Sequence, residues 1–103
     1  MVETGPIAPP SVDIRVELFG SARLLVGKHH VDISVPEQAD ISDIVTTLSG
    51  VCPELVGDVI HEDRSQLQPS HTFNLNGTTF LSDGSVELRE GDTLLMFSSQ
   101  AGG

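Results

Sequence analysis

The chain has 103 residues, of which 15 are acidic and 5 basic, for a formal net charge of −10 and a hydrophobic content of 38%. This length allows one domain with one modest core, and the composition excludes a disordered chain. The charge argues against nucleic acid and membranes as partners, because phosphate contacts need lysine and arginine. It favours a partner with a basic groove, or solubility alone.

The single cysteine, Cys52, excludes an internal disulfide and any four-cysteine zinc or iron–sulfur site. We interpret it as a small buried hydrophobic residue rather than a nucleophile. No apolar run approaches membrane-spanning length, and the N-terminus lacks a basic region followed by an apolar stretch. We therefore expect a cytoplasmic protein.

Residues 1–11 carry three prolines and no periodicity, which predicts a disordered leader before a domain at 12–97 and a flexible tail at 98–103. The first predicted strand covers residues 12–19, and a short turn or helical connection follows it. A second strand covers residues 29–35 and is stopped by Pro36. Both strands alternate apolar and polar residues, which predicts one buried face, and an antiparallel hairpin is the simplest pairing. The inward residues are Val12, Ile14, Val16, Leu18, Val31, Ile33 and Val35.

A helical period replaces the alternation after Asp40, which is placed to cap a helix N-terminus with Asp43 in the first turn. Gly50 offers a left-handed stop, and Pro53 can start a second short helical turn. The predicted apolar faces are Ile41, Ile44, Val45 and Leu48 in the helix, and Leu55, Val56 and Ile60 after it.

Asn76-Gly77 lies between two extended runs and predicts a hairpin, and Gly91-Asp92 predicts a turn into the last strand. The order is two strands, a helix and further short strands. This order predicts an α+β domain in which a mixed sheet of about five short strands packs on one main helix. Among small folds the β-grasp fits this order best.

The candidates for chemistry within the domain are weak. His29 and His30 are expected to be adjacent on a strand and to point to opposite faces, and neither they, His61 nor His71 shows the ligand spacing of a zinc site. Neither a Ser-His-Asp arrangement nor a phosphate-binding glycine loop can be argued. We therefore predict no metal, no bound cofactor and no self-contained active site.

In the last strand, residues 93–97, apolar residues occupy both the odd-numbered and the even-numbered positions, which point to opposite faces of a sheet. If Leu94 and Met96 face the helix, Leu95 and Phe97 face outward beside the tail. Phe19 has the outward parity of the first strand, so we expect it to join Leu95 and Phe97 in an exposed patch where a partner docks. The alternative is a central strand that is covered on both sides.

The sequence ends in Ala101-Gly102-Gly103. Glycine lacks a Cβ, so Gly102-Gly103 can enter a channel too narrow for other residues. The terminal carboxylate is a poor electrophile until it is activated, normally as a mixed anhydride with AMP. The alternative is an end with no function.

From about Val12 to Gly103 the chain resembles the MoaD/ThiS sulfur carriers of the ubiquitin-like β-grasp superfamily. The resemblance lies in LFGSARLLVG after the first strand, in the helix after a strand that ends in proline, and in the segment from His71 through Phe73 to Leu75-Asn76-Gly77. It continues in Leu88-x-x-Gly91-Asp92 and in the final Ala-Gly-Gly.

The resemblance implies that Gly103 is adenylated by an E1-like enzyme of the MoeB/ThiF type, which uses ATP and a sulfur donor. The resulting thiocarboxylate would supply sulfur to a downstream enzyme of molybdopterin (molybdenum cofactor), thiamin, cysteine or thiolated-tRNA synthesis. On this reading the chain is no enzyme and is a monomer when free. Two alternatives stay open: a tag attached to target lysines through Gly103, and a β-grasp interaction module with an inert end.

Overall fold

The computed structural model describes residues 11–81 and 85–98, and of Phe97 the backbone alone. Its strands are β1 (Ser11–Leu18), β2 (His30–Pro36), β3 (Gln38–Asp40), β4 (His71–Leu75), β5 (Thr79–Phe80), β6 (Ser85–Glu87) and β7 (Thr93–Ser98). Its helices are α1 (Gly20–Val26), α2 (Ile41–Val51) and the 3-10 turn η1 (Pro53–Leu55). The first and last strands thus reach one residue into the predicted leader and tail. The rest of both segments lies outside the described residues.

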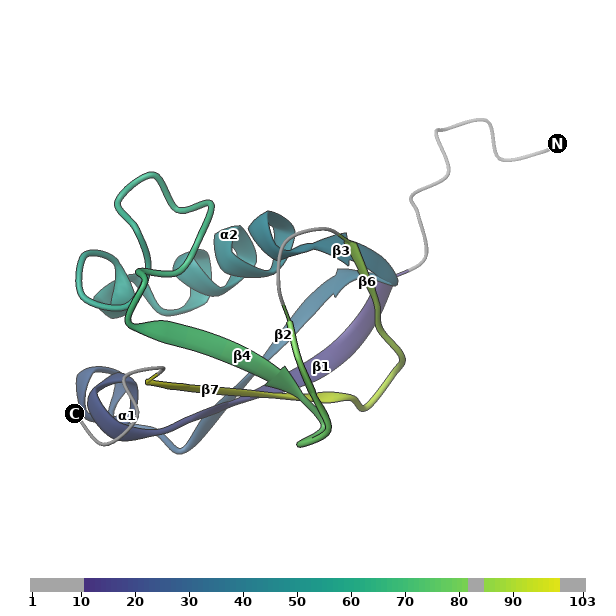
Figure 1. Ribbon diagram of the computed structural model, residues 1–103, viewed down its shortest axis with the longest axis horizontal. Helices are drawn as coiled ribbons and strands as arrows, with labels where there is room; N and C mark the ends of the chain where they lie inside the picture. Colours follow the sequence, from purple (N-terminus) through teal and green to yellow (C-terminus); the bar gives the residue numbers. More distant parts are fainter. Residues whose placement is uncertain (1–10, 82–84, 99–103) are drawn as a thin grey trace, which may run out of the picture.

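Five strands form one mixed sheet in the order β2-β1-β7-β4-β5 (Figure 1). β1 and β2 form the predicted antiparallel hairpin, and β7 pairs in parallel with β1 and antiparallel with β4. The expected α+β architecture, a mixed sheet with one main helix, is confirmed. The parallel pair places the ends of the first and last strands at the same end of the domain.

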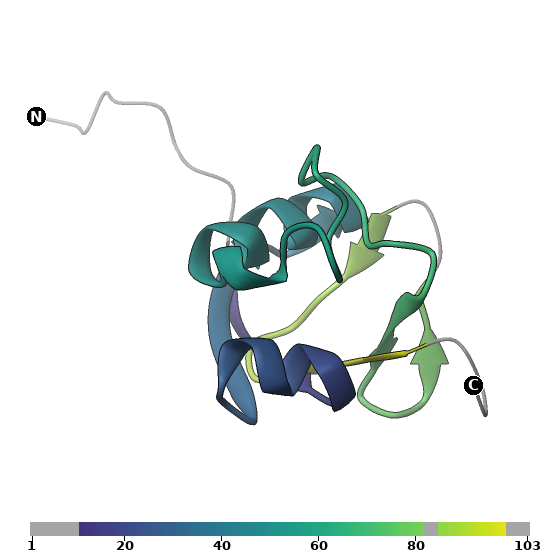
Figure 2. The same ribbon diagram turned by 90° about the vertical axis from the view of Figure 1, so that its left-hand side faces the viewer.

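The core lies between α2 and one face of the sheet, and the strand alternation predicts it correctly. All seven inward residues of β1 and β2 are buried, as are the helix residues Ile44, Val45 and Leu48. Phe73, Leu94 and Met96 complete this face from β4 and β7. α2 runs along one side of the sheet in both views (Figures 1 and 2), and it contacts β2.

Helix α2 begins where the sequence predicts and ends later. Asp40 is the N-cap residue, and its backbone N–H donates to the carboxylate of Asp43 at 3.0 Å. The predicted stop at Gly50 is wrong, because the helix continues to Val51 and its C-cap is Cys52, whose backbone (φ −128°, ψ 72°) is outside the helical region. Pro53 explains this end, since a residue before proline is disfavoured in the helical region.

A second, two-stranded sheet was not predicted. β3 pairs antiparallel with β6, with Ala39 opposite Val86. Each strand has three residues, too few for an alternating pattern to be recognised, and about 45 positions separate them. The predicted turn at Pro53 is confirmed as η1, which buries Leu55.

The Asn76-Gly77 hairpin between β4 and β5 is confirmed. Both residues have positive φ (56° and 78°), as the preferred two-residue hairpin turn requires. The side chain of Asn76 also ties this turn to the start of β7. Its Oδ1 accepts from the N–H of Thr93 at 2.9 Å, and its Nδ2 donates to Asp92 at 3.2 Å.

Candidate functional site

Strand β7 is the last strand before the tail, and the residues of β7 that face the core are the two that the sequence predicts. Leu94 and Met96 are fully buried, whereas Leu95 between them is half-buried. The outer face of the sheet is therefore only partly covered at Leu95.

Leu95 occupies the middle of a row of side chains on the outer face. The register places it opposite Glu17 of β1 on one side and Asn74 of β4 on the other, and Asn74 lies opposite Phe80 of β5. Phe80 is 62% exposed. Sequence reasoning missed Phe80, although an apolar residue three positions after an Asn-Gly turn is a signal that could have identified it.

Asn74 is an unusual member of this row. Its side chain is buried, with 6% exposure, and its Oδ1 has no hydrogen-bond partner among the described residues. A buried acceptor without a donor typically costs about 1–3 kcal/mol of stability. The outer face thus carries a polar group that the described part of the fold does not satisfy.

Phe19 lies just beyond β1 rather than within it. It is half-buried and is the N-cap residue of α1, and the guanidinium of Arg23 lies 5.3 Å from its ring centre. Arg23 Nε also donates to the carbonyl oxygen of Leu18 at 2.9 Å. Phe19 is therefore held at the junction of the sheet and α1.

The remaining predicted site residues cannot be placed in the same way. The backbone of Phe97 pairs with Thr72, but its side chain lies outside the described residues, as do Ala101, Gly102 and Gly103. The predicted patch of Phe19, Leu95 and Phe97 stays a prediction.

The other end of the outer face is polar. A hollow of about 320 Å³ is lined by Asp13, Ile14, Arg15, Asp32, Gly91 and Thr93. Arg15 forms an exposed ion pair with Asp32 at 3.4 Å, and the Ser34 hydroxyl donates to the carboxylate of Asp13. This end offers carboxylates to a partner, in line with the net charge of the chain.

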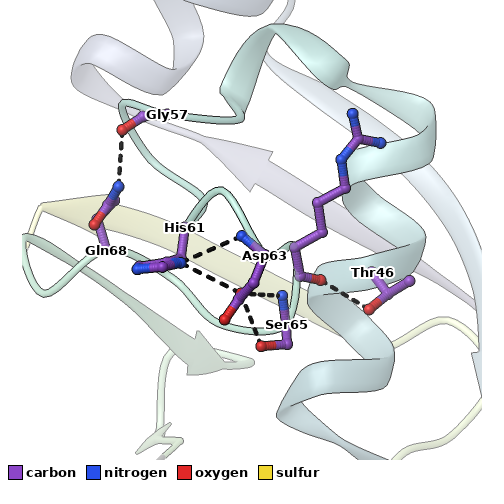
Figure 3. Close-up of polar contacts among 7 residues, drawn as sticks. Thr46, Gly57, His61, Asp63, Ser65 and Gln68 are labelled. Carbon is purple, nitrogen blue, oxygen red and sulfur yellow. Dashed lines mark hydrogen bonds and ion pairs between the residues drawn. The ribbon is translucent and has the colours of Figure 1, made fainter.

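His61, Asp63 and Ser65 gather in the loop after η1 (Figure 3), but they do not form a catalytic triad. The backbone N–H and hydroxyl of Ser65 both donate to Asp63, which holds the pKa of that carboxyl below its usual value. A nucleophilic serine would instead donate to the histidine. The contacts anchor the loop, together with the Thr46 hydroxyl, which donates to the carbonyl oxygen of Arg64.

The other histidines and the cysteine offer no reactive centre. His29 precedes β2 instead of lying on it, so the expectation that it shares a strand with His30 is wrong; both are exposed. His71 is half-buried, and this burial lowers its pKa. Burial raises the pKa of the Cys52 thiol, and Glu54 adds to the effect, as expected of a buried hydrophobic residue.

Within residues 11–81 and 85–98, no group of three or more metal-binding side chains comes together. The helices of the same part of the chain are all too short or too polar to cross a bilayer.

Solved structures similar to this one were found, whereas no model of a sequence family and no curated protein matches the chain. One is the crystal structure of the small archaeal modifier protein SAMP1 from Haloferax volcanii, with a TM-score of 0.72 and 25% identity, covering 88% of this chain and 99% of that one. The chain has the ubiquitin-like β-grasp fold. This confirms the resemblance to the ubiquitin-like β-grasp carriers that the sequence indicated.

Two further structures with this β-grasp fold extend the comparison. The solution structure of SAMP1 from Methanosarcina acetivorans matches with a TM-score of 0.65 and 22% identity, over 91% of this chain and 99% of that one. A Pyrococcus furiosus protein assigned as molybdopterin converting factor, subunit 1, matches with a TM-score of 0.62 and 24% identity, over 84% and 97%. At these identities both show the fold alone.

Proposed function

We propose that the chain is a ubiquitin-like sulfur carrier, a protein cosubstrate rather than an enzyme. The observation that carries the proposal is a β-grasp domain matching almost the whole of an archaeal modifier protein at 25% identity and followed by Gly102-Gly103.

In the proposed cycle the Gly103 carboxylate attacks the α-phosphate of ATP on an E1-like enzyme, which forms an acyl adenylate and releases pyrophosphate. Sulfide supplied by the donor then attacks the acyl carbon, the bond to the phosphate oxygen breaks, AMP leaves, and a thiocarboxylate remains. On the downstream enzyme the thiocarboxylate sulfur attacks the acceptor, and water then hydrolyses the acyl–sulfur bond, which leaves the sulfur on the acceptor and regenerates the carboxylate. The chain itself supplies the reacting carboxylate and the surface that positions it.

The fold supports a role in which the chain supplies the carboxylate and the partner enzyme supplies the active site. β7 is paired with β1 as far as Met96 and with β4 as far as Ser98, which is exposed. Residues 98–103 would span roughly 20 Å if fully extended. A rigid sheet can therefore present the end of the chain to an active site that lies inside a partner.

The docking surface that we propose for the activating enzyme is the outer face beside β7, with Leu95, Phe97 and Phe19. An aromatic or aliphatic anchor beside the tail lets docking energy offset the entropy lost when the tail is threaded. The acidic end of the same face, at Asp13 and Asp32, suits a basic rim on the enzyme.

A tag attached to lysines is the second candidate function, and the names of the archaeal modifier structures favour it. Both functions share the adenylation step and differ in the nucleophile that follows. Lys28, which is exposed, is the only lysine of the chain, so conjugation of one copy to the side chain of another would have a single site.

Intact mass separates the two functions. The chain is incubated with ATP, sulfide and its cognate adenylating enzyme, with ATP omitted as the control. Replacement of one oxygen by sulfur supports the carrier. Covalent conjugates without any thiocarboxylate would contradict the carrier and support the tag.

A further inference from the structure

The short helix α1 carries more apolar surface than the fold uses. Of its seven residues only Ala22 is fully buried, whereas Leu24 is 84% exposed and Leu25 37% exposed. A helix of this length is marginal in isolation and depends on contacts made by its ends and its inner face. Ala22, the half-buried Val26 and the Arg23–Leu18 hydrogen bond supply those contacts. Leu24 contributes little to them.

These leucines lie at the end of the domain where the tail begins. β1 and β7 run in parallel, so α1 follows directly from the end of β1 and contacts β7 near its own end. Figures 1 and 2 both show α1 beside the end of β7. The described chain stops at Ser98, and five further residues lead from there to Gly103. Any protein that receives those residues must approach this end.

Arg23 connects α1 with the proposed docking surface on the sheet. Its guanidinium lies over the ring of Phe19, and its Nε bonds to the last residue of β1. Leu24 is the next residue along the helix. Phe19 and Arg23 thus join the end of β1 to α1, the helix that also carries Leu24.

The charge of α1 also sets it apart from the rest of the chain. Arg23 and Lys28, on α1 and the turn after it, are two of the five basic residues, and α1 itself has no acidic residue. The sheet face instead carries Asp13, Glu17 and Asp32. A partner would meet an apolar centre with a basic border on α1, and carboxylates on the sheet.

We propose that Leu24 and Leu25 of α1 form a second docking surface for the same adenylating enzyme. The enzyme would then contact the domain both on the outer face of the sheet and on α1. The matching enzyme surface is an apolar pocket with an acidic or neutral border. The inference rests on the proposed function and adds a contact site to it.

The test is steady-state ATP–pyrophosphate exchange by the cognate adenylating enzyme at varied concentrations of the full chain. Leu24→Gln keeps the size and helix propensity of the residue but removes its apolar surface. We expect KM for the chain to rise about tenfold, as for the loss of one interface anchor worth about 1.4 kcal/mol, with kcat within about twofold. Val51→Thr is the matched control: Val51 is 50% exposed at the end of α2, and KM should stay unchanged.

The failures of the two proposals can be told apart. No exchange with the wild-type chain would overturn the proposed function itself. Normal exchange with an unchanged KM for Leu24→Gln would overturn the second surface alone, as would an equal rise in KM for Val51→Thr. If Leu24→Gln melts early, Leu24→Ala carries the same test. A wild-type dimer that Leu24→Gln dissociates would assign the surface to a second copy, against the proposal.

Discussion

Leu18 of β1 and Met96 of β7 lie opposite each other in a parallel pair, and both are fully buried. One consequence is local: two residues beyond Met96 the described part of β7 ends, at the level where α1 begins. The other consequence concerns the two faces of the sheet, because Leu95, which precedes the buried Met96 in β7, lies on the face away from the core. The Leu18–Met96 pair therefore places the end of the described chain beside the start of α1, and Leu95 on the outer face of the sheet.

The parity of β7 predicts opposite effects for two adjacent substitutions. Met96→Ala should lower the free energy of unfolding by about 2–5 kcal/mol, since it leaves a cavity in the core. Leu95→Ala should cost less stability but weaken binding to the adenylating enzyme by roughly 2 kcal/mol. Urea unfolding and titration calorimetry measure the two effects. Equal losses of stability with unchanged binding would contradict the assignment of Leu95 to the docking surface.

Asn74→Val should stabilise the free protein. The substitution removes a buried acceptor that has no partner among the described residues, and it places a β-branched residue in a strand. We expect a gain of about 1 kcal/mol in the free energy of unfolding, measured in urea. The neighbouring Thr72→Val serves as the control for β-propensity alone. A loss of stability would mean that Oδ1 is satisfied in solution.

The half-buried His71 should make stability depend on pH. Burial lowers its pKa from the ordinary value of 6.5, so between the two values the unfolded chain binds more protons than the folded chain. The free energy of unfolding should therefore fall as the pH drops below about 6.5. The fall should be smaller in His71→Gln when both proteins are unfolded in urea at pH 7.5 and pH 5. Identical falls would show that His71 is not responsible.

Gly102→Val tests the width of the tail. Stability should stay within about 0.5 kcal/mol, the usual range for surface substitutions. Activation should be blocked, because a channel that admits only backbone excludes the isopropyl group. Gly102→Ala adds one methyl and should show an intermediate rate of pyrophosphate exchange. A normal rate for the valine variant would show that the channel does not select for glycine.

Much of the fold could be predicted because its main elements have long, regular patterns. Eight residues of β1 alternate without a break, and Asn76-Gly77 marks a turn that few other pairs can form. The three-residue β3 and β6 have no such pattern, and their pairing depends on contacts distant in sequence. The end of α2 differs from the predicted one because Gly50 is accommodated within the helix, whereas Pro53 disfavours the helical conformation of the residue before it.

The candidate site was predicted less completely for a related reason. Parity indicates which face of a strand a residue occupies, but not how far its neighbours cover it. Asn74 and Phe80 lie on the same outer face, yet one is buried and the other exposed. The exposure of Leu24 likewise depends on how a short helix meets the sheet, which its apolar composition does not reveal.

In the proposed function Gly103 is the reacting residue of a protein cosubstrate. The most direct test is ATP–pyrophosphate exchange by the cognate adenylating enzyme with the full chain and with a chain that lacks only Gly103, with thermal melting of both. We predict equal melting temperatures and no exchange above background for the shortened chain. Full exchange with the shortened chain would contradict the account.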